Sequence, residues 1–295
     1  MVMKTCLQRH APVVPKIAEG VMMLKKRGSG HESFDRMLKP VQYFLDRIYM
    51  SRVGMMILSG AHVRNFDSSH ASTNENYSSI DVKCNIVNVI KEAADNAKFL
   101  CEQYYETSPD VNIITGSPDF QFPYIPSHLY HIMFELLKNS MRAVVEQHQG
   151  GPLPAIKVIL THGTEDLTIK LSDEGGGISR SDIGQIFTYL YTTAEAPMEE
   201  EDLTSQDMKN APLAGFGYGL PISRLYARYM GGELKIVSME GYGTDAFVYL
   251  LASADKAEEV LPEFTRREMK QYTITGSMSD WLLPPEKLVD KKGAD

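Results

Sequence analysis

Cysteine, tryptophan and long apolar runs are all scarce in this chain of 295 residues. The three cysteines, Cys6, Cys84 and Cys101, are too few and too widely spaced to form a disulfide framework or a zinc site. No apolar run approaches the roughly 18 residues that a membrane-spanning helix requires. These absences argue against a disulfide-stapled secreted protein and against a transmembrane helix, and they favour a reducing compartment.

An excess of positive charge is also missing. The chain has 30 Lys and Arg residues against 38 Asp and Glu residues, which gives a formal net charge of −8. A nucleic-acid-binding protein would normally present a basic face, so this balance argues against that class. The first residues lack both the apolar core of a secretion signal and an Arg- and Ser-rich presequence. Because helical periodicity begins almost at once, we expect an upstream part of a helical domain to be missing.

Two familiar classes of phosphate-transferring enzyme are excluded by their absent motifs. The sequence has no Gly-x-x-x-x-Gly-Lys-Ser/Thr motif, so it is not a P-loop enzyme. It has neither His-Arg-Asp nor Asp-Phe-Gly, so the protein-kinase motif set is absent too. The glycines at Gly215 to Gly219 follow a stretch rich in Glu and Asp rather than a strand, which excludes a Rossmann fingerprint.

Hydrophobic periodicity and turn residues predict an α+β chain. Helices are expected over residues 10–62 (with a turn at Gly28 to Gly30), 86–104, 127–148 (with Ser127 as N-cap and Gly150-Gly151 at the end), 181–190 and 219–230. Strands are expected over residues 111–115, 156–162, 166–171, 233–238 and 244–251. The polar, aperiodic residues 64–79 are the predicted linker. We therefore expect a partial all-helical N-terminal bundle (1–75), an α/β sandwich with a mixed sheet (76–255) and a tail (256–295).

The helix predicted from Ser127 has polar groups on one face. Leu129, Ile132, Met133, Leu136, Leu137 and Val144 recur at three- and four-residue steps and form the expected buried stripe. His131, Glu135 and Asn139 follow one another at four-residue steps along another face, and Arg142 comes three residues later. The side-chain oxygen of Asn139 is a suitable ligand for Mg²⁺, and Glu135 could act as a general base oriented by His131. By itself the pattern also fits an ordinary solvated helix face.

Two glycine-rich loops favour the functional interpretation of that helix. Asp173 to Gly177 follows a predicted strand, where a carboxylate could accept a hydrogen bond from the exocyclic amine of adenine. Gly215 to Gly219 opens a predicted helix, whose backbone N–H groups could bind phosphate. The acidic, unpatterned residues 195–212 precede this second loop and are interpreted as a lid over a nucleotide. Together these features predict an enzyme that uses Mg-ATP.

Taken in order, these segments resemble the four sequence boxes of the GHKL ATPase superfamily, which includes histidine kinases and type II topoisomerases. Glu135 to Asn139 resembles the N box, Asp173 to Gly177 the G1 box, Gly215 to Gly219 the G2 box, and Gly243-Thr244 the last box. The resemblance implies the Bergerat fold for the second domain.

Longer segments resemble the mitochondrial pyruvate dehydrogenase kinases. They are Tyr43 to Arg52, His128 to Ala143, Leu213 to Arg228 and Ser238 to Asp245, which together span most of the chain. The resemblance implies a protein-serine kinase that phosphorylates the E1α subunit of pyruvate dehydrogenase and switches it off. Branched-chain ketoacid dehydrogenase kinase is the near relative, and the Asp280-Trp281 pair favours the pyruvate enzyme.

The resemblance also assigns roles to residues. Glu135 becomes the base for the substrate serine with His131 beside it, Asn139 the Mg²⁺ ligand, and Asp173 the residue that recognises adenine. Further contacts to ATP are expected from Arg142, Gly175, Gly177, Thr192, Thr193, Gly215, Phe216, Gly217, Tyr218, Gly219, Leu220 and Thr244.

The partners and location implied are those of the family. They are the E1α subunit as substrate, the lipoyl domains of the E2 core as a docking site, a second copy of the chain, and the mitochondrial matrix, although no transit peptide is visible. Asp280-Trp281 resembles the C-terminal pair that links the two subunits by a crossing tail. No nucleic acid partner and no membrane span are expected.

Two departures from the family pattern concern regulation. Only the later part of the family's N-terminal bundle is present, although this bundle normally provides the lipoyl-docking pocket. It also holds a pyruvate-like inhibitor site, to which His10, Ser51 and Arg52 would contribute; the Arg expected three residues before His10 is Leu7 here. We therefore expect altered docking and regulation.

Two further functional hypotheses remain open from the sequence. One is a non-catalytic partner that binds nucleotide and dimerises with a full-length kinase, which would show nucleotide binding without phosphate transfer. The other is a histidine autokinase, for which His10 is a weak candidate acceptor because it lacks an acidic neighbour. Acid-labile phosphate on His10 would distinguish that case.

Overall fold

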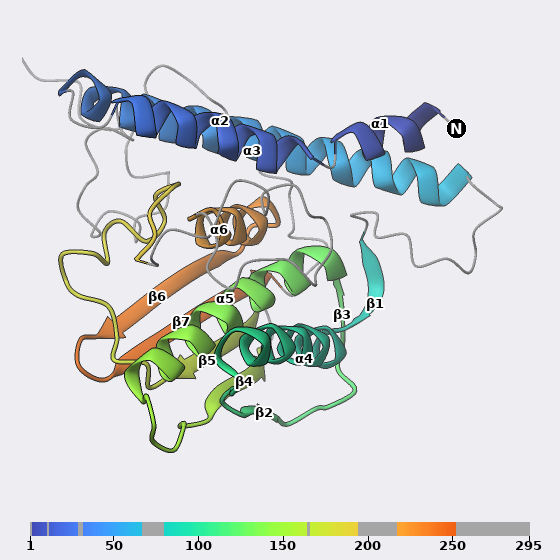
Figure 1. Ribbon diagram of the computed structural model, residues 1–295. Helices are drawn as coiled ribbons and strands as arrows, with labels where there is room; N and C mark the ends of the chain where they lie inside the picture. The colour runs from blue at the N-terminus through green and yellow to red at the C-terminus, as the bar shows by residue number, and fades with distance from the viewer. Residues whose placement is uncertain are drawn as a thin grey trace, which may run out of the picture.

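The computed structural model describes residues 2–10, 12–28, 32–66, 80–163, 166–193 and 217–251. The chain begins with three helices, α1 (Val2–His10), α2 (Val13–Gly28) and α3 (Glu32–Phe66). Helices α1 and α2 both pack along α3, as Figure 1 shows in blue. The helical character predicted for residues 10–62 is thus confirmed where the structure describes them. Most of the predicted linker, the predicted lid and the whole C-terminal tail with Asp280-Trp281 lie outside the described residues.

A five-stranded mixed sheet follows. Its strand order is β2 (Val111–Thr115), β4 (Ile156–His162), β5 (Asp166–Asp173), β7 (Gly243–Leu251) and β6 (Glu233–Met239). β2 runs parallel to β4, and all other neighbours in this sheet are antiparallel. Each strand agrees with its predicted range to within two residues. The α+β class with a mixed sheet is therefore confirmed.

Three helices cover one face of this sheet: α4 (Ile86–Tyr105), α5 (Pro126–Gln147) and α6 (Gly219–Tyr229) (Figure 1). Alternate strand residues point toward them, so that Leu167, Ile169 and Leu171 of β5 are buried while the residues between them are not. The predicted apolar stripe of α5 is buried along its whole length, which confirms the helical periodicity. None of the described helices is long and apolar enough to cross a membrane.

Two short strands were not predicted. β1 (Asp81–Asn85) and β3 (Gln121–Tyr124) pair antiparallel in a separate two-stranded sheet. β1 is largely polar and β3 contains Pro123, so neither shows the apolar alternation that marks a longer strand. Asn85 ends β1 and caps α4, because its Oδ1 accepts a hydrogen bond from N of Asn88 at 3.0 Å.

The predicted helix over residues 181–190 is wrong. The segment forms consecutive hydrogen-bonded turns instead, with bonds from N of Gln185 to O of Asp182 and from N of Thr188 to O of Gln185. A glycine at position 184 weakens the helix, and Leu190 adopts a φ of 65°, which ends any helical run. The periodicity of the apolar residues was real, but it arises from three-residue turns.

Ser127 is not the N-cap of α5, which is a second correction. The helix begins one residue earlier at Pro126, and the N-cap residue is Ile125, which makes no side-chain capping bond. Proline at the first helical position has its φ already fixed and has no N–H group to satisfy. The hydroxyl of Ser127 is buried and has no hydrogen-bond partner within the described residues.

Helix α3 is joined to the sheet domain through residues 189–190. The side chain of Gln42 makes two hydrogen bonds to the backbone of Tyr189. Its Nε2 donates to O of Tyr189 at 3.1 Å, and its Oε1 accepts from N of Tyr189 at 2.8 Å. The hydroxyl of Tyr189 donates to Asp46 at 2.7 Å, and its ring packs against Tyr49 and Tyr218. The bundle therefore holds the segment that leads into residues 191–193.

Candidate functional site

A cavity of about 460 Å³ opens between α5, the end of β5, residues 191–193 and the start of α6. This volume is in the range of small-molecule and cofactor sites. The sequence-predicted residues that line it are Glu135, Asn139, Arg142, Asp173, Gly175, Gly177, Thr192, Thr193, Gly217, Gly219, Leu220 and Thr244. Residues that lie more than a hundred residues apart in the sequence thus line the same cavity. The interpretation of these residues as one nucleotide site requires this.

Four other predicted residues are placed differently. His131 and Tyr218 are absent from the cavity wall. Tyr218 is buried in the junction between α3 and α6, where its ring packs edge-on against Tyr49 at 6.2 Å. It therefore supports the loop rather than the cavity surface. Gly215 and Phe216 lie outside the described residues.

Glu135 has its two carboxylate oxygens engaged on different sides. Oε1 pairs with Nζ of Lys138, one helical turn away, at 2.8 Å. Oε2 lies against the start of α6, where a Cβ atom at position 219 would overlap it. Only glycine fits there, so Gly219 makes room for the carboxylate at the cavity wall.

The charge of Glu135 is fixed by its neighbours. Burial by itself would raise the pKa of this carboxyl, but the Lys138 ammonium, with a smaller contribution from His131, lowers the pKa below its usual value. Lys138 is itself buried and lies over the ring of Phe134 at 5.0 Å. Glu135 is therefore held as a carboxylate in a largely enclosed position, which is the form that a general base needs.

His131 lies one turn before Glu135 on α5, behind the cavity. Its ring contacts Tyr226 edge-on at 5.2 Å, and its Nε2 has no hydrogen-bond partner within the described residues. Burial lowers the pKa of His131, which favours the neutral ring. The structure thus brings His131 close enough to Glu135 for an electrostatic effect and records no hydrogen bond from its Nε2 to the carboxylate.

Asp173 ends β5 at the bottom of the cavity and is held by three hydrogen bonds. Its Oδ2 accepts from the hydroxyl of Ser140 at 2.6 Å, and its Oδ1 accepts from N of Gly175 at 3.0 Å and N of Thr244 at 3.2 Å. Burial raises the pKa of Asp173, and these three bonds oppose that effect. Strand β7 contributes directly, because Thr244 is the cross-strand partner of Asp173.

The loop after Asp173 folds tightly against the turn between β6 and β7. Gly177 has a φ of 73°, and a Cβ there would overlap the backbone carbonyl of Met239. Any other residue would be strained and would push the loop away from this turn. N of Gly176 also donates to O of Tyr242 at 3.1 Å, so the loop is fixed by backbone contacts.

Residues 191–193 close another side of the cavity. Nη2 of Arg142 donates to the hydroxyl of Thr193 at 2.8 Å, which joins this segment to α5. At the base of the segment, N of Leu190 donates to O of Gly217 at 3.2 Å. The predicted threonines and Gly217 are therefore physically connected as well as close to the cavity.

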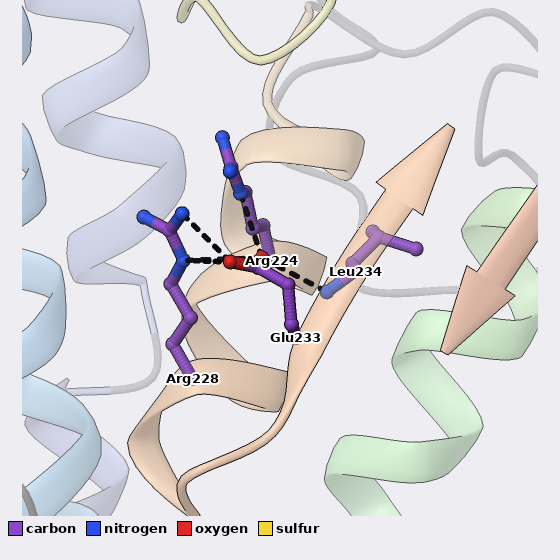
Figure 2. Close-up of polar contacts among 4 residues, drawn as sticks. All are labelled: Arg224, Arg228, Glu233 and Leu234. Atoms are coloured by element: carbon purple, nitrogen blue, oxygen red, sulfur yellow. Dashed lines mark hydrogen bonds and ion pairs between the residues drawn. The ribbon is translucent and has the colours of Figure 1, made fainter. Parts of the chain in front are cut away.

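Helix α6 is anchored to β6 by a half-buried ion cluster, which helps to fix the position of the helix that Gly219 begins. Figure 2 shows Arg224 and Arg228 converging on the carboxylate of Glu233, with N of Leu234 as a further donor. Burial would raise the pKa of Glu233, but the two guanidinium groups lower it. Arg224 also lies over the ring of Phe187 at 4.4 Å. These contacts hold the helix start against the cavity.

The donor set suits a cation that is shared with a ligand. The described residues contain no group of three or more His, Cys, Asp or Glu side chains that could hold a metal ion by themselves. Asn139 is exposed and lines the cavity, so its side-chain oxygen is available to a bound ion. Mg²⁺ typically takes few protein ligands and keeps phosphate oxygens and waters, which this arrangement fits.

Several cavity residues were missed by the sequence analysis. Ser140, Ala143 and Gln147 of α5 line the cavity, as do Ser179, Asp182, Tyr191 and further apolar residues. For α5 a signal existed, since Ser140, Ala143 and Gln147 follow one another at helical spacing beside Asn139. The expected helix over residues 181–190 is a series of turns instead, so helical spacing could not place Asp182, and Ser179 and Tyr191 lie outside that segment.

Comparison with known proteins gives a consistent result. Residues 124–254 match the family model described as histidine kinase-, DNA gyrase B- and HSP90-like ATPase. Residues 1–82 match the model described as mitochondrial branched-chain alpha-ketoacid dehydrogenase kinase.

Individual relatives align along nearly the whole chain. The mitochondrial pyruvate dehydrogenase (acetyl-transferring) kinase of Drosophila melanogaster is 44% identical over 282 residues, which cover 92% of this chain and 67% of that protein. Isozyme 4 of the same kinase from Ictidomys tridecemlineatus is 42% identical, with 97% and 69% covered. The kinase of Ascaris suum is 43% identical, with 95% and 69% covered.

Proposed function

Since the chain belongs to the family of mitochondrial pyruvate dehydrogenase kinases, we propose that it transfers the γ-phosphate of ATP to a serine of the E1α subunit of pyruvate dehydrogenase. This phosphorylation inactivates the complex and restrains the conversion of pyruvate to acetyl-CoA. The observation that carries the proposal is the placement of Glu135 and Asn139 side by side in one cavity that residues of both glycine loops also line.

Each side chain has a role in the proposed transfer. Glu135 takes the proton of the substrate serine, because Lys138 keeps it ionised and Gly219 makes room for its second oxygen at the cavity wall. His131 supports Glu135 from behind. Asp173 binds the adenine amino group, while Gly177, Gly217 and the start of α6 lie along the phosphates. Phosphoryl transfer depends mainly on positioning and on charge stabilisation, which these groups supply.

Magnesium completes the nucleotide site. Asn139 would hold the ion through its side-chain oxygen, and the phosphate oxygens of ATP would provide further ligands. Bound there, the cation neutralises negative charge that develops on the transferred phosphate. Arg142 and Thr193, which are already hydrogen-bonded to each other, would lie beside the phosphates.

The proposed setting follows the family. The protein acts in the mitochondrial matrix as a homodimer and docks on the lipoyl domains of the E2 core. A second copy is supported by the face of the sheet on which, within the described residues, Val237 and Met239 are exposed. An inhibitor site for pyruvate-like anions in the bundle is supported by one contact, from Nη2 of Arg52 to O of His10 at 2.6 Å.

The alternatives have less support. A branched-chain ketoacid dehydrogenase kinase is suggested by the match of residues 1–82, whereas pyruvate dehydrogenase kinases align over nearly the whole chain at 42–44% identity. A non-catalytic partner would not need a carboxylate kept ionised at the cavity wall. A histidine autokinase would need an accessible acceptor, and His10 lies in α1, outside the cavity.

Replacing Glu135 by Gln tests the catalytic proposal. The amide keeps the shape of the side chain but cannot accept the serine proton, so turnover on E1α should fall about 10²–10⁴-fold. ATP affinity, measured by calorimetry, should stay within about twofold of the parent, because the nucleotide contacts are retained.

Glu92 provides a matched control. It is an exposed glutamate of α4 outside the cavity, and Glu92→Gln should leave turnover and ATP affinity unchanged. If single-turnover transfer by Glu135→Gln equalled that of the parent, Glu135 would be only a structural residue. A parent protein that binds ATP but never phosphorylates E1α would instead point to the non-catalytic partner.

A further inference from the structure

The carboxylate of Asp173 has most of its acceptor sites occupied by the protein itself. A carboxylate offers about four lone-pair sites, two on each oxygen. On Oδ1, N–H groups of Gly175 and Thr244 take both, and on Oδ2 the hydroxyl of Ser140 takes one. One site therefore remains for a ligand, and it belongs to the oxygen that Ser140 holds.

Ser140, which makes this contact, is a buried residue of the cavity wall. It lies on α5 directly after Asn139, is only 5% exposed, and lines the same cavity as Asp173. Its distance of 2.6 Å to Oδ2 is short, as is typical of hydroxyl bonds to a carboxylate. The two side chains come from different layers of the fold, so the contact also fixes the distance between α5 and β5.

We propose that Ser140 is a specificity-determining residue for the base of the nucleotide. This inference rests on the proposed function, in which Asp173 binds the adenine amino group. The hydrogen bond from Ser140 fixes the direction of the one acceptor site that Asp173 has left. It also commits the only proton of the hydroxyl, so that Ser140 presents lone pairs, not a donor, to the ligand.

The chemical consequence is selection at position 6 of the purine. An acceptor carboxylate with an acceptor hydroxyl beside it favours a ligand that offers an amino group there. A purine with a carbonyl oxygen at the same position would place a further acceptor against these two, and the remaining acceptor site of Asp173 would be left without a donor. Such unpaired buried polar groups are a strong source of discrimination. The site thus selects 6-aminopurine over 6-oxopurine nucleotides.

Inosine triphosphate (ITP) is the sharpest probe. Its base, hypoxanthine, differs from adenine only in having an oxo group in place of the 6-amino group and, as a consequence, a proton on N1. Calorimetry with Mg²⁺ should give a clear preference of the parent for ATP over ITP. In Ser140→Ala, ATP affinity should fall about fivefold, the usual worth of one hydrogen bond. The ATP-to-ITP affinity ratio should fall in parallel, because the variant can admit a water or rotate Asp173.

Two further variants make the result specific. Ser140→Cys keeps the volume but supplies only a weak S–H donor, so it should lower the ratio as Ser140→Ala does. It also decides the matter if the alanine variant does not fold. Ser127→Ala removes a buried hydroxyl from the same helix that has no described partner, and it should leave the ratio unchanged.

A double-mutant cycle tests whether Ser140 acts through Asp173. In the Asp173→Ala background the change at Ser140 should have no further effect on the ratio, because the acceptor that Ser140 orients has gone. Equal effects of Ser140→Ala with and without Asp173 would overturn the inference. So would a parent-like ratio in both folded Ser140 variants, and that result would leave the kinase proposal intact. A parent that binds neither ATP nor ITP would overturn the proposed function, and the role of Ser140 with it.

Discussion

Two buried carboxyl groups in one cavity have pKa values displaced in opposite directions. Burial raises the pKa of both Glu135 and Asp173, and their partners decide the outcome. Glu135 is paired with the Lys138 ammonium, so its pKa is lowered overall. Asp173 has only neutral donors, and burial prevails. Environments that separate two acids in this way often assign them different roles. Here Glu135, which is paired with a charge, is suited to accept a proton, and Asp173, which is held by neutral hydrogen-bond donors, is suited to bind the adenine of a nucleotide.

Asn139 is predicted to bind the metal, and its removal should be visible in binding alone. Asn139→Ala should abolish measurable Mg-ATP binding and leave the fold intact, because alanine is favoured in a helix. Calorimetry in EDTA should give the same weak ATP binding for parent and variant. Asn88→Ala, an exposed position on α4, is the matched control and should bind Mg-ATP as the parent does. Unchanged Mg-ATP affinity in Asn139→Ala would remove Asn139 from the metal site.

His128 makes the stability of the protein sensitive to mild acid. Burial, with a smaller effect of His131, lowers the pKa of His128 to about 3. An unfolded histidine titrates near ~6.5, so below that pH the unfolded chain binds a proton that the folded chain excludes. The stabilisation from neutral His128 is therefore complete above ~6.5 and is lost progressively toward about 3.

His128→Phe should remove this sensitivity. The new ring can keep the stacking on Tyr226, whose centroid lies 4.0 Å from that of the imidazole. Between pH 7 and pH 5 the parent should lose about 2 kcal/mol more unfolding free energy than the variant. Urea unfolding at the two pH values measures the difference. Equal losses in both proteins would mean that His128 takes up a proton as readily in the folded protein as in the unfolded chain.

At the residue scale, the sequence was sufficient to predict those site residues whose positions follow from helical spacing. Glu135, Asn139 and Arg142 share a helix face, and their places in the cavity follow from four- and three-residue spacing. The partners that define them were not predictable in this way. The pairing of Lys138 with Glu135 follows helical spacing, but its burial depends on packing against Phe134. The bond from Ser140 to Asp173 joins α5 to β5 and requires the tertiary fold.

At the element scale, helix α3 controls one side of the cavity at a distance. Gln42 binds the backbone of Tyr189 through both ends of its amide, and Tyr191, two residues on, already lines the cavity. Lys25 of α2 adds a bond from Nζ to O of Leu190 at 3.1 Å. The N-terminal helices therefore support the left-handed turn at Leu190 that directs residues 191–193 toward the cavity.

Gln42→Ala should weaken both the fold and the nucleotide site. It leaves the backbone N–H and C=O of Tyr189 without partners in a buried place, which should cost about 2–3 kcal/mol of unfolding free energy. ATP affinity should also fall several-fold, because residues 191–193 lose their fixed position. Phe44→Ala, an exposed position on the same helix, should change neither quantity appreciably. A destabilised Gln42→Ala that bound ATP as tightly as the parent would show that the two regions are uncoupled.

The elements that the sequence predicted well are those with a long, regular apolar pattern. Helices α4 and α5 and all five strands of the large sheet meet this condition. β1 and β3 do not, because β1 is largely polar and β3 is interrupted by Pro123. The segment 181–190 failed for another reason. Its apolar residues recur at helical spacing, but a glycine and the φ of 65° at Leu190 give turns instead.

At the scale of the whole molecule, the large sheet has an uncovered face. Within the described residues its helices lie on one side only, and the other side carries a row formed by Ile159, Lys170, Phe247 and Lys235 in register. On β6 the side chains of Val237 and Met239 are 59% and 67% exposed. Apolar side chains on a sheet face are normally buried against another layer. A second copy of the chain is the partner that the family predicts.

The dimer prediction can be tested on that face. Parent protein at micromolar concentration should sediment as a dimer. Val237→Lys with Met239→Lys should shift it to monomer, because each dimer would bury four added charges without partners. Val82→Lys, at an exposed position of the small sheet, is the control and should remain dimeric. If the double variant were as dimeric as the parent, the contact would lie elsewhere, and the tail with Asp280-Trp281 would be the next segment to remove. A monomeric parent would contradict the predicted dimer itself. The sheet face would then need a different covering layer, since its apolar residues would otherwise be left in water.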